Sequence, residues 1–305
     1  MLNRRQFIAQ STLACGALSL PLSMSAQATS SQKITILHTN DVHSHVDPFP
    51  KNHSRYANQG GAAARAQLIK TIRQEEQHVV LLDAGDIFQG TPYFNLFEGQ
   101  VEYDLMNYMQ YDAATLGNHD FDLGMESLVK QLKRAKFPML NANYDLSETI
   151  LNQDVNSHCI IKKGNINIGI YGLGIDPKGL IPDQLCEGLV YTDPIQVMLD
   201  QENQLKTLGC DLIICLSHLG FEYKSKLVSD KILAQHSKFT HLILGGHTHT
   251  FLEKPFEFLR QDGSKILVNQ AGWAGLQLGR IDLEISSQNE LSFVKSENLN
   301  LSLCY

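Results

Sequence analysis

Short apolar runs recur along the chain, and polar or glycine-rich sequence follows each of them directly. The runs are continuous rather than alternating and too short for helices, so they predict strands buried on both faces. They cover residues 33–38, 78–82, 111–115, 137–143, 211–216 and 241–244. Helical patterns lie between several of these runs, at residues 60–77, 101–110, 124–136 and 194–208. Strands that alternate with helices favour an α/β fold with parallel pairing.

The remaining apolar runs predict antiparallel pairing. Residues 159–172 are predicted to form a hairpin around a turn at Lys163-Gly164-Asn165. Further along, the runs at 266–268, 278–283 and 291–293 predict antiparallel strands that close a second sheet. We therefore expect two sheets rather than one.

Side chains able to bind metal ions follow five of the predicted strands. They are Asp41 and His43, Asp86, Asn118 and His119, His218, and His247 and His249. A carboxylate directly after a buried parallel strand lies at the edge where open α/β sheets bind their ligands. Residues two apart in extended backbone point to the same side, so Asp41 and His43 can share one cation.

Three of these segments carry most of the argument. Asp86 has two carboxylate oxygens and is our candidate for a ligand that bridges two cations. Residues 245–249, Gly-Gly-His-Thr-His, are the most specific signal, because the glycines allow a tight turn and each imidazole can reach a different cation. Residues 116–122 place an amide, an imidazole and two carboxylates in one turn, which predicts the centre of a two-metal hydrolytic site.

Each segment taken alone has a structural alternative. Residues 116–122 are also compatible with an Asx-type turn and a solvated histidine, and the Asp41–His43 segment with an ordinary strand-end turn. We interpret Asp83 and His38 as structural residues, and His45 as a bystander. The repetition of the same pattern after five strands favours the metal site.

The first 28 residues predict an export signal rather than part of the fold. Arg4 and Arg5 precede a mildly apolar stretch at residues 7–24, and Ala26-Gln27-Ala28 offers small residues for cleavage. This resembles a twin-arginine signal and predicts a periplasmic or secreted protein. Polar residues and a proline interrupt the stretch, which argues against a stable membrane span. A lipoprotein signal that uses Cys15 stays open as an alternative.

Length and charge limit the number of domains and the classes of binding partner. The chain has 305 residues, 43% of them hydrophobic, and no internal repeat, which predicts a single domain over residues 29–305. Without the leader, 23 basic residues face 32 acidic ones, a formal charge of −9 that argues against binding a nucleic-acid polymer. Five cysteines would remain with no Cys-x-x-Cys pair, so a zinc ribbon is excluded and any disulfide pairing stays open.

The strand-end motifs resemble those of the calcineurin-like metallophosphoesterases, and within them the 5′-nucleotidase family. The matching segments are residues 37–43, 60–65, 85–86, 117–122, 191–194 and 245–249. The resemblance implies a four-layer α/β/β/α sandwich. It also implies two metal sites, one formed by Asp41, His43, Asp86 and His249, the other by Asp86, Asn118, His218 and His247. His119 would then be a catalytic residue that binds no metal, and Asp122 would orient it.

The implied charges fit phosphate chemistry. Two divalent cations outweigh two carboxylates and a bound hydroxide, which leaves the site with about one positive charge inside an acidic protein. We expect direct attack by the metal-bound hydroxide, while protonated His119 stabilises the developing charge or protonates the leaving oxygen. Mixed nitrogen and oxygen ligands suit Mn²⁺, Zn²⁺ or Fe²⁺.

The sequence departs from many nucleotidases of that family, which have a second, C-terminal substrate domain. We expect release of phosphate from nucleotides, and a separate protein that supplies the substrate domain is one possible partner. Alternatively, the chain acts alone as a broad phosphomonoesterase or phosphodiesterase, including on cyclic nucleotides, or as a thiosulfate-ester hydrolase. From another class, it is a non-catalytic binding subunit, although the intact ligand positions weigh against this.

Overall fold

Two β-sheets form the framework of the protein in the computed structural model, which describes residues 31–260, 262–286, 288 and 290–302. The first sheet has the strand order β15 (Leu291–Asn300), β14 (Gln277–Ile285), β1 (Gln32–Thr39), β2 (Val79–Asp83), β3 (Ala113–Thr115), β4 (Met139–Leu140) and β6 (Val155–Asn156). The second has the order β12 (Phe256–Leu259), β13 (Lys265–Asn269), β11 (Leu242–Gly245), β10 (Leu212–His218), β8 (Ile166–Gly174) and β7 (His158–Lys163). A separate short pair joins β5 (Tyr144–Asp145) to β9 (Val190–Tyr191). The predicted leader and Cys15 lie outside the described residues.

The two sheets pack face to face because their central strands are apolar on both sides. In β1, Ile34 and Ile36 belong to the cluster between the sheets, whereas Leu37 faces the opposite way. In β10, Ile214 belongs to that same inner cluster and Ile213 to an outer one. Side chains alternate between the two faces of a strand, so an uninterrupted apolar run supplies two cores at once.

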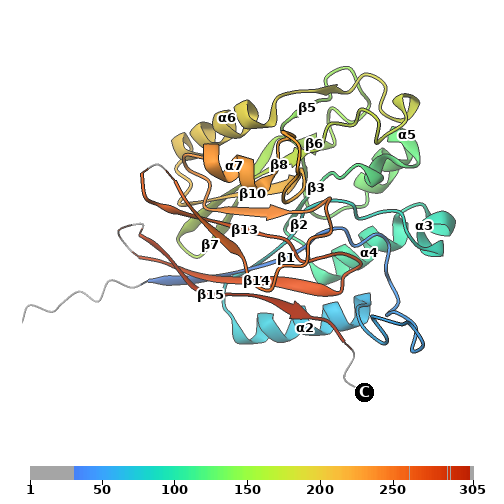
Figure 1. The fold of residues 1–305 in the computed structure, drawn as a ribbon, viewed down its shortest axis with the longest axis horizontal. Helices are drawn as coiled ribbons and strands as arrows, with labels where there is room; N and C mark the ends of the chain where they lie inside the picture. The colour runs from blue at the N-terminus through green and yellow to red at the C-terminus, as the bar shows by residue number, and fades with distance from the viewer. Residues whose placement is uncertain (1–30, 261, 287, 289, 303–305) are drawn as a thin grey trace, which may run out of the picture. The chain divides into compact units, whose positions relative to one another are not determined.

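Helices cover the outer face of each sheet. The first sheet is covered by α2 (Ala62–Glu75), α3 (Pro92–Phe97), α4 (Gln100–Met109) and α5 (Gly124–Leu132), and the second by α6 (Pro194–Thr207) and α7 (Asp230–His236). Figure 1 shows α6 and α7 on one side of the sheets and α2 and α4 on the other. The predicted four-layer α/β/β/α sandwich is confirmed.

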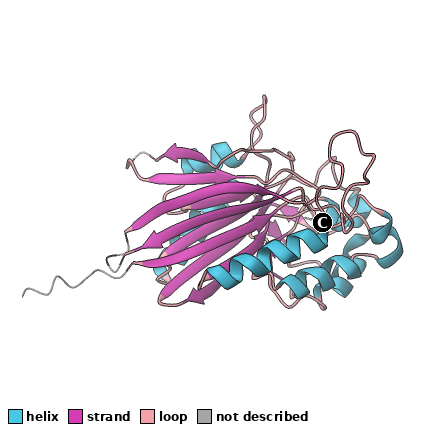
Figure 2. Cartoon of the chain, turned by 90° about the horizontal axis from the view of Figure 1, so that it is seen from below, coloured by secondary structure: helices cyan, strands magenta, loops and turns pink. Residues whose placement is uncertain are grey.

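The parallel strands place their carboxyl ends together. β1, β2 and β3 run parallel within the first sheet, and β8, β10 and β11 run parallel within the second. Because the chain leaves each parallel strand at the same edge, the loops that follow them meet there. Figure 2 shows long loops gathered at one end of the strands.

One sequence prediction is wrong in its pairing. The runs near the end of the chain do not close a single second sheet: β13 joins the second sheet parallel to β11, whereas β14 pairs antiparallel with β1 in the first sheet. An apolar run shows that a strand is buried but not which strand it pairs with.

Two predicted elements are shorter than expected. The strand predicted at 137–143 is reduced to β4, because the Asn141 side chain accepts backbone N–H bonds from Asn143 and Tyr144 at 3.2 and 2.9 Å and forms a turn. The helix predicted at 124–136 ends at Leu132, after which bonds between residues three apart finish the turn.

Two absences hold for the described residues alone. No helix there combines the length and hydrophobicity needed to cross a membrane. The cysteines described there are all free, namely Cys159, Cys186, Cys210 and Cys215.

Glu202 ties α6 to the segment before β11, and this contact gives a stability prediction. Its buried carboxylate accepts bonds from the Ser237 hydroxyl at 2.5 Å and from the backbone nitrogens of Lys238 and Thr240 at 2.8 and 2.9 Å. Replacement by alanine leaves these donors without an acceptor, so we expect Glu202→Ala to lower the free energy of unfolding by about 3 kcal/mol. Urea-induced unfolding measures this loss.

Glu202→Gln keeps an oxygen acceptor, and we expect it to lose less of the free energy of unfolding than Glu202→Ala. The matched control is Gln204→Ala on the exposed side of the same helix, expected to stay within about 0.5 kcal/mol of the unchanged protein. Equal stability of the Glu202→Ala and Gln204→Ala variants would contradict the role given to this carboxylate.

Candidate metal centre

The strand-end side chains from both sheets converge in two overlapping clusters. In each cluster, one potential ligand atom from every residue lies within 4.8 Å of the others. The first cluster contains Asp41, His43, Asp86 and His249, and the second contains Asp86, His218 and His247. Asn118 adjoins the second, because its Oδ1 lies 2.9 Å from His247 Nδ1. The structure therefore brings together all seven residues predicted as metal ligands.

Asp86 belongs to both clusters. Its Oδ2 lies 3.1 Å from His218 Nε2 and 3.7 Å from His43 Nε2, while its Oδ1 accepts a bond from the His119 backbone nitrogen at 2.8 Å. Burial alone would raise the pKa of the Asp86 carboxyl, but the His218 imidazole beside it outweighs burial and holds this pKa well below its usual range. Asp86 is thus a fully buried carboxylate that stays ionised.

His218 presents a nitrogen with no hydrogen bond to the centre of the site. Its Nδ1 lies 2.7 Å from the Ala84 carbonyl oxygen and donates to it, which directs Nε2 toward Asp86. Nε2 is buried and makes no hydrogen bond of acceptable geometry within the described part of the chain, although the Asp86 oxygen is only 3.1 Å away. A buried nitrogen aimed at a carboxylate without bonding it is the arrangement expected of two ligands that share a cation.

The other imidazoles show the same convergence. His43 Nδ1 lies 3.1 Å from the Phe88 carbonyl oxygen, and its Nε2 faces His249 Nε2 at 3.0 Å. Burial lowers the pKa of His43 and lowers that of His247 to about 4, so both rings are neutral, as metal ligands must be. The donor set of imidazoles, carboxylates and one amide oxygen therefore fits divalent cations of the Mn²⁺, Fe²⁺ and Zn²⁺ type.

The backbone at the ligands is strained. Five of them are non-glycine residues with left-handed φ angles, at 49° for Asp41 and His43, 55° for Asp86, 74° for His247 and 51° for His249. Such conformations cost roughly 1 kcal/mol or more each and concentrate at functional sites. The turns therefore aim these side chains inward at a cost that the surrounding structure must offset.

His119 and Asp122 lie outside both clusters. His119 begins the short 3₁₀ turn His119–Phe121 and Asp122 follows it, and His119 Nδ1 is 2.9 Å from Asp122 Oδ2. This bond raises the pKa of His119, so its protonated form is favoured. The imidazole is 36% exposed and lies 5.3 Å from the His43 ring, centroid to centroid. It can therefore reach a substrate bound at the clusters.

Asp120 has a role that the sequence did not reveal. Its buried carboxylate accepts bonds from the backbone nitrogens of Ile87, Phe88 and Gly117 at 3.0, 3.3 and 2.7 Å. It thereby ties the turn that carries Asp86 to the turn that carries Asn118. Nothing local distinguishes Asp120 from the neighbouring Asp122, because two of its three partners, Ile87 and Phe88, come from a separate part of the chain.

The segment after β13 also supports the site. Gln270 donates to the Gly246 carbonyl oxygen at 2.8 Å and accepts from the Thr250 backbone nitrogen at 3.1 Å, so it brackets the loop of His247 and His249. Trp273 stacks on the His249 ring at 5.6 Å and an interplanar angle of 6°. Both residues follow an ordinary buried strand, and the sequence pattern carried no signal for them.

Comparisons with known proteins agree with this geometry. A family model described as calcineurin-like phosphoesterase matches residues 34–251. The 5′-nucleotidase of Homo sapiens is 34% identical over 300 residues, which is 92% of this chain and 50% of that protein. The crystal structure of a 5′-nucleotidase precursor from Thermus thermophilus superimposes with a TM-score of 0.80 at 30% identity, over 89% of this chain and 55% of that one. The structure of the NAD nucleotidase of Haemophilus influenzae superimposes with a TM-score of 0.78 at 28% identity, over 90% of this chain and 51% of that one.

The chain spans about half the length of the curated relatives it matches. The matched half contains all the strand-end segments that form the two clusters.

Gly117 packs so closely against Asp86 that it gives a prediction about the site. A Cβ atom at this position would overlap both the carboxylate and the backbone nitrogen of Asp86. We expect Gly117→Ala to displace Asp86 and weaken Mn²⁺ binding to the chelator-stripped protein by at least about tenfold. Isothermal titration calorimetry measures this affinity. Gly209→Ala is the control, because a Cβ there meets no atom within 4 Å and any strain from its φ of 78° falls before β10, at the opposite end of that strand from His218. Unchanged Mn²⁺ affinity in Gly117→Ala would refute the packing argument.

Proposed function

The chain belongs to the calcineurin-like phosphoesterase family and has the domain of a metal-dependent phosphoester hydrolase; on that premise, we propose that it hydrolyses nucleotide phosphate esters with two divalent cations. The position of Asp86 carries the proposal, because its carboxylate belongs to both ligand clusters. One carboxylate has two oxygens and can bind two cations. When bound, such a pair of cations lowers the pKa of an attacking water and stabilises the charge on the phosphate oxygens.

The two proposed ligand sets follow the clusters. One consists of Asp41, His43, Asp86 and His249, and the other of Asp86, Asn118, His218 and His247. With neutral imidazoles and only two carboxylates, the sets leave a pair of dications partly uncompensated. A phosphate dianion therefore has a favourable place to bind in an otherwise acidic protein.

His119 supplies the proton in this proposal. Asp122 holds the imidazole and favours its charged form, and the ring is exposed enough to approach a substrate. We assign it the role of stabilising the charge that develops on the phosphate or of protonating the leaving oxygen. No side chain is needed as a nucleophile, so the reaction proceeds without a covalent intermediate.

Nucleotides are the proposed substrates because relatives with 34% and 30% identity are named 5′-nucleotidases. The match covers only about half of each of these relatives, and that half contains the candidate metal ligands. We therefore propose that this chain provides the phosphate-cleaving part. Selection of the nucleotide base would then depend on contacts outside the region that matches the relatives. Those contacts would come from other parts of this protein or from a separate partner protein. Residues 1–28, a predicted twin-arginine leader, underlie the further proposal that the protein is exported to the periplasm or secreted.

A substrate panel tests the activity. We expect the chelated protein to be inactive and addition of Mn²⁺, Zn²⁺ or Fe²⁺ to restore phosphate release, with nucleoside 5′-monophosphates turned over fastest. Cyclic nucleotides, UDP-sugars and an aryl phosphate complete the panel, and released phosphate is the measured quantity. Full turnover in excess chelator, or no turnover with any added metal, would refute the proposal. Fastest turnover of the aryl phosphate would instead identify a broad phosphomonoesterase.

His119→Ala tests the proton-transfer role. We expect kcat to fall roughly 10²–10⁴-fold, because general acid catalysis is lost, while both metal ions remain bound. Metal content by inductively coupled plasma spectrometry and kcat are measured on the same preparation. Asp122→Asn is the matched variant. We expect its kcat to fall less than that of His119→Ala, because the imidazole stays in place. Loss of metal from His119→Ala would show that the residue is a ligand after all.

A further inference from the structure

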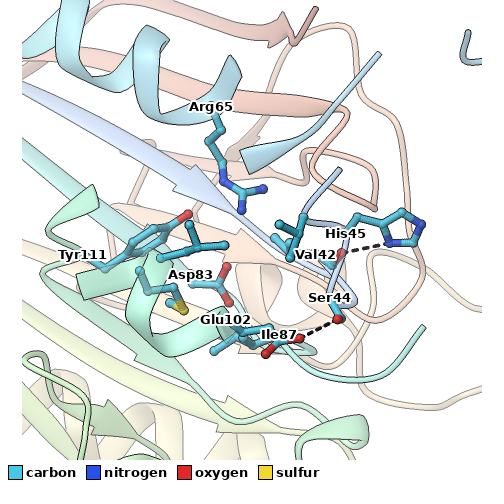
Figure 3. A pocket seen from close by; sticks show the side chains of 11 residues that line it. Val42, Ser44, His45, Arg65, Asp83, Ile87, Glu102 and Tyr111 are labelled. Carbon is cyan, nitrogen blue, oxygen red and sulfur yellow. Dashed lines mark hydrogen bonds between the residues drawn. The ribbon is translucent and has the colours of Figure 1, made fainter. Parts of the chain in front are cut away.

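A small internal cavity lies directly behind the turn that carries Asp41 and His43. It has a volume of about 20 Å³, and its lining includes Arg65 from α2, Asp83 at the end of β2 and Glu102 from α4. Figure 3 shows the Arg65 guanidinium directed from its helix toward the Asp83 carboxylate. A space of this size is sufficient for one water molecule, since about 10–15 Å³ on the same measure is required.

Polar atoms on the cavity wall have no hydrogen-bond partner among the residues that the structure describes. Arg65 is 4% exposed, and its Nε and Nη1 are both without an acceptor. Glu102 is 5% exposed, and its Oε2 is without a donor. Among the described residues, Arg65 forms no ion pair within 4.0 Å, although two carboxylates line the same cavity. Buried polar groups of this kind are almost always bonded, so each of these atoms is expected to have a partner in the cavity.

The two carboxylates hold opposite ends of the metal-binding turn. Asp83 Oδ2 accepts a bond from the Thr39 hydroxyl at 2.6 Å, just before Asp41. Glu102 accepts a bond from the Ser44 hydroxyl, just after His43. The residues between these anchors include left-handed positions, so the anchors restrain a turn that is strained by itself.

We propose that this cavity is an internal solvent site in which one ordered water molecule accepts a hydrogen bond from Arg65 and donates to Asp83 and Glu102. Water is the occupant that the wall requires, because only a neutral group with both functions can accept from a guanidinium and donate to carboxylates. A halide cannot donate to the carboxylates, and an alkali cation cannot accept from Arg65. Through this water, Arg65 stabilises the two anchors and thereby positions Asp41 and His43 for metal binding.

Diffraction on the unmodified full chain tests the occupant. We expect one solvent peak roughly 2.7–3.2 Å from an Arg65 nitrogen and from a carboxylate oxygen of Glu102 or Asp83. Parallel crystals soaked in bromide and in rubidium should show no anomalous signal in the cavity. An anomalous peak from either ion, or an empty cavity, overturns the proposal. This result is independent of any hydrolytic activity.

Variants test the positioning role through metal affinity. We expect Arg65→Met to raise the dissociation constant for Mn²⁺ by about tenfold, measured by calorimetry on chelator-stripped protein. The double variant Arg65→Met/Glu102→Gln should recover most of the Mn²⁺ affinity. The Glu102 carboxylate, which Arg65→Met leaves without a compensating positive charge, is removed as well. Non-additivity of the two changes is the signature that separates a shared water-bridged network from two independent packing defects.

Arg73→Met is the matched control. Arg73 lies on the same helix, and its guanidinium donates to the Met109 and Gln110 carbonyl oxygens away from the metal-binding turn. We expect this variant to leave the Mn²⁺ affinity unchanged. Equal affinity losses in Arg65→Met and Arg73→Met, or no loss in Arg65→Met, would overturn the positioning role. If Arg65→Met does not fold, Glu102→Gln alone must still weaken Mn²⁺ binding, and unchanged affinity in that variant overturns the role equally.

Discussion

The site depends on turns that hold non-glycine residues in a left-handed conformation at the ends of buried strands. Asp41, His43 and Asp86 belong to this group, as do both histidines of the 245–249 loop. Each turn costs free energy by itself, and it persists because the strand before it is packed on both faces in the sandwich. The apolar strands and the polar site are therefore parts of one structure: the cores fix the strand ends, and the strand ends fix the ligand atoms.

A layer of buried polar groups lies between these cores and the ligands. Asp120 joins two ligand turns by accepting three backbone N–H bonds, and Asp230 accepts a bond at 2.6 Å from the hydroxyl of Ser217, the residue before His218. Burial raises the pKa of Asp120 and of Asp230 to about 7. Their ionised forms are thus costly in the absence of nearby positive charge. Carboxylates placed behind a cluster of ligands are consistent with a centre that contributes positive charge of its own.

The sequence predicts those parts of the protein that have a local signature. Strands β1, β2, β10 and β11 are recognisable as short apolar runs, and the ligands are recognisable because they follow such runs directly. The pairing of β14 is not predictable in this way, since the same apolar run suits either sheet. The supporting roles of Gln270, Trp273 and Asp120 are also hidden, because each acts on a segment that only the tertiary fold brings near. Local patterns thus identify candidate ligands, whereas the long-range contacts that orient them require the structure.

The protonation of the histidines separates the proposed metal ligands from the proposed acid, His119. Burial lowers the pKa of His43 and His247, which keeps both rings neutral and able to bind a cation, whereas Asp122 raises the pKa of the more exposed His119. His218 is the informative exception: burial opposes its charged form, yet contact with Asp86 raises its pKa to about 10. Its Nδ1 proton is committed to the Ala84 carbonyl oxygen, so the added proton resides on Nε2, the atom that faces Asp86. A cation that binds between His218 Nε2 and Asp86 would displace this proton, because a ligand nitrogen must be neutral.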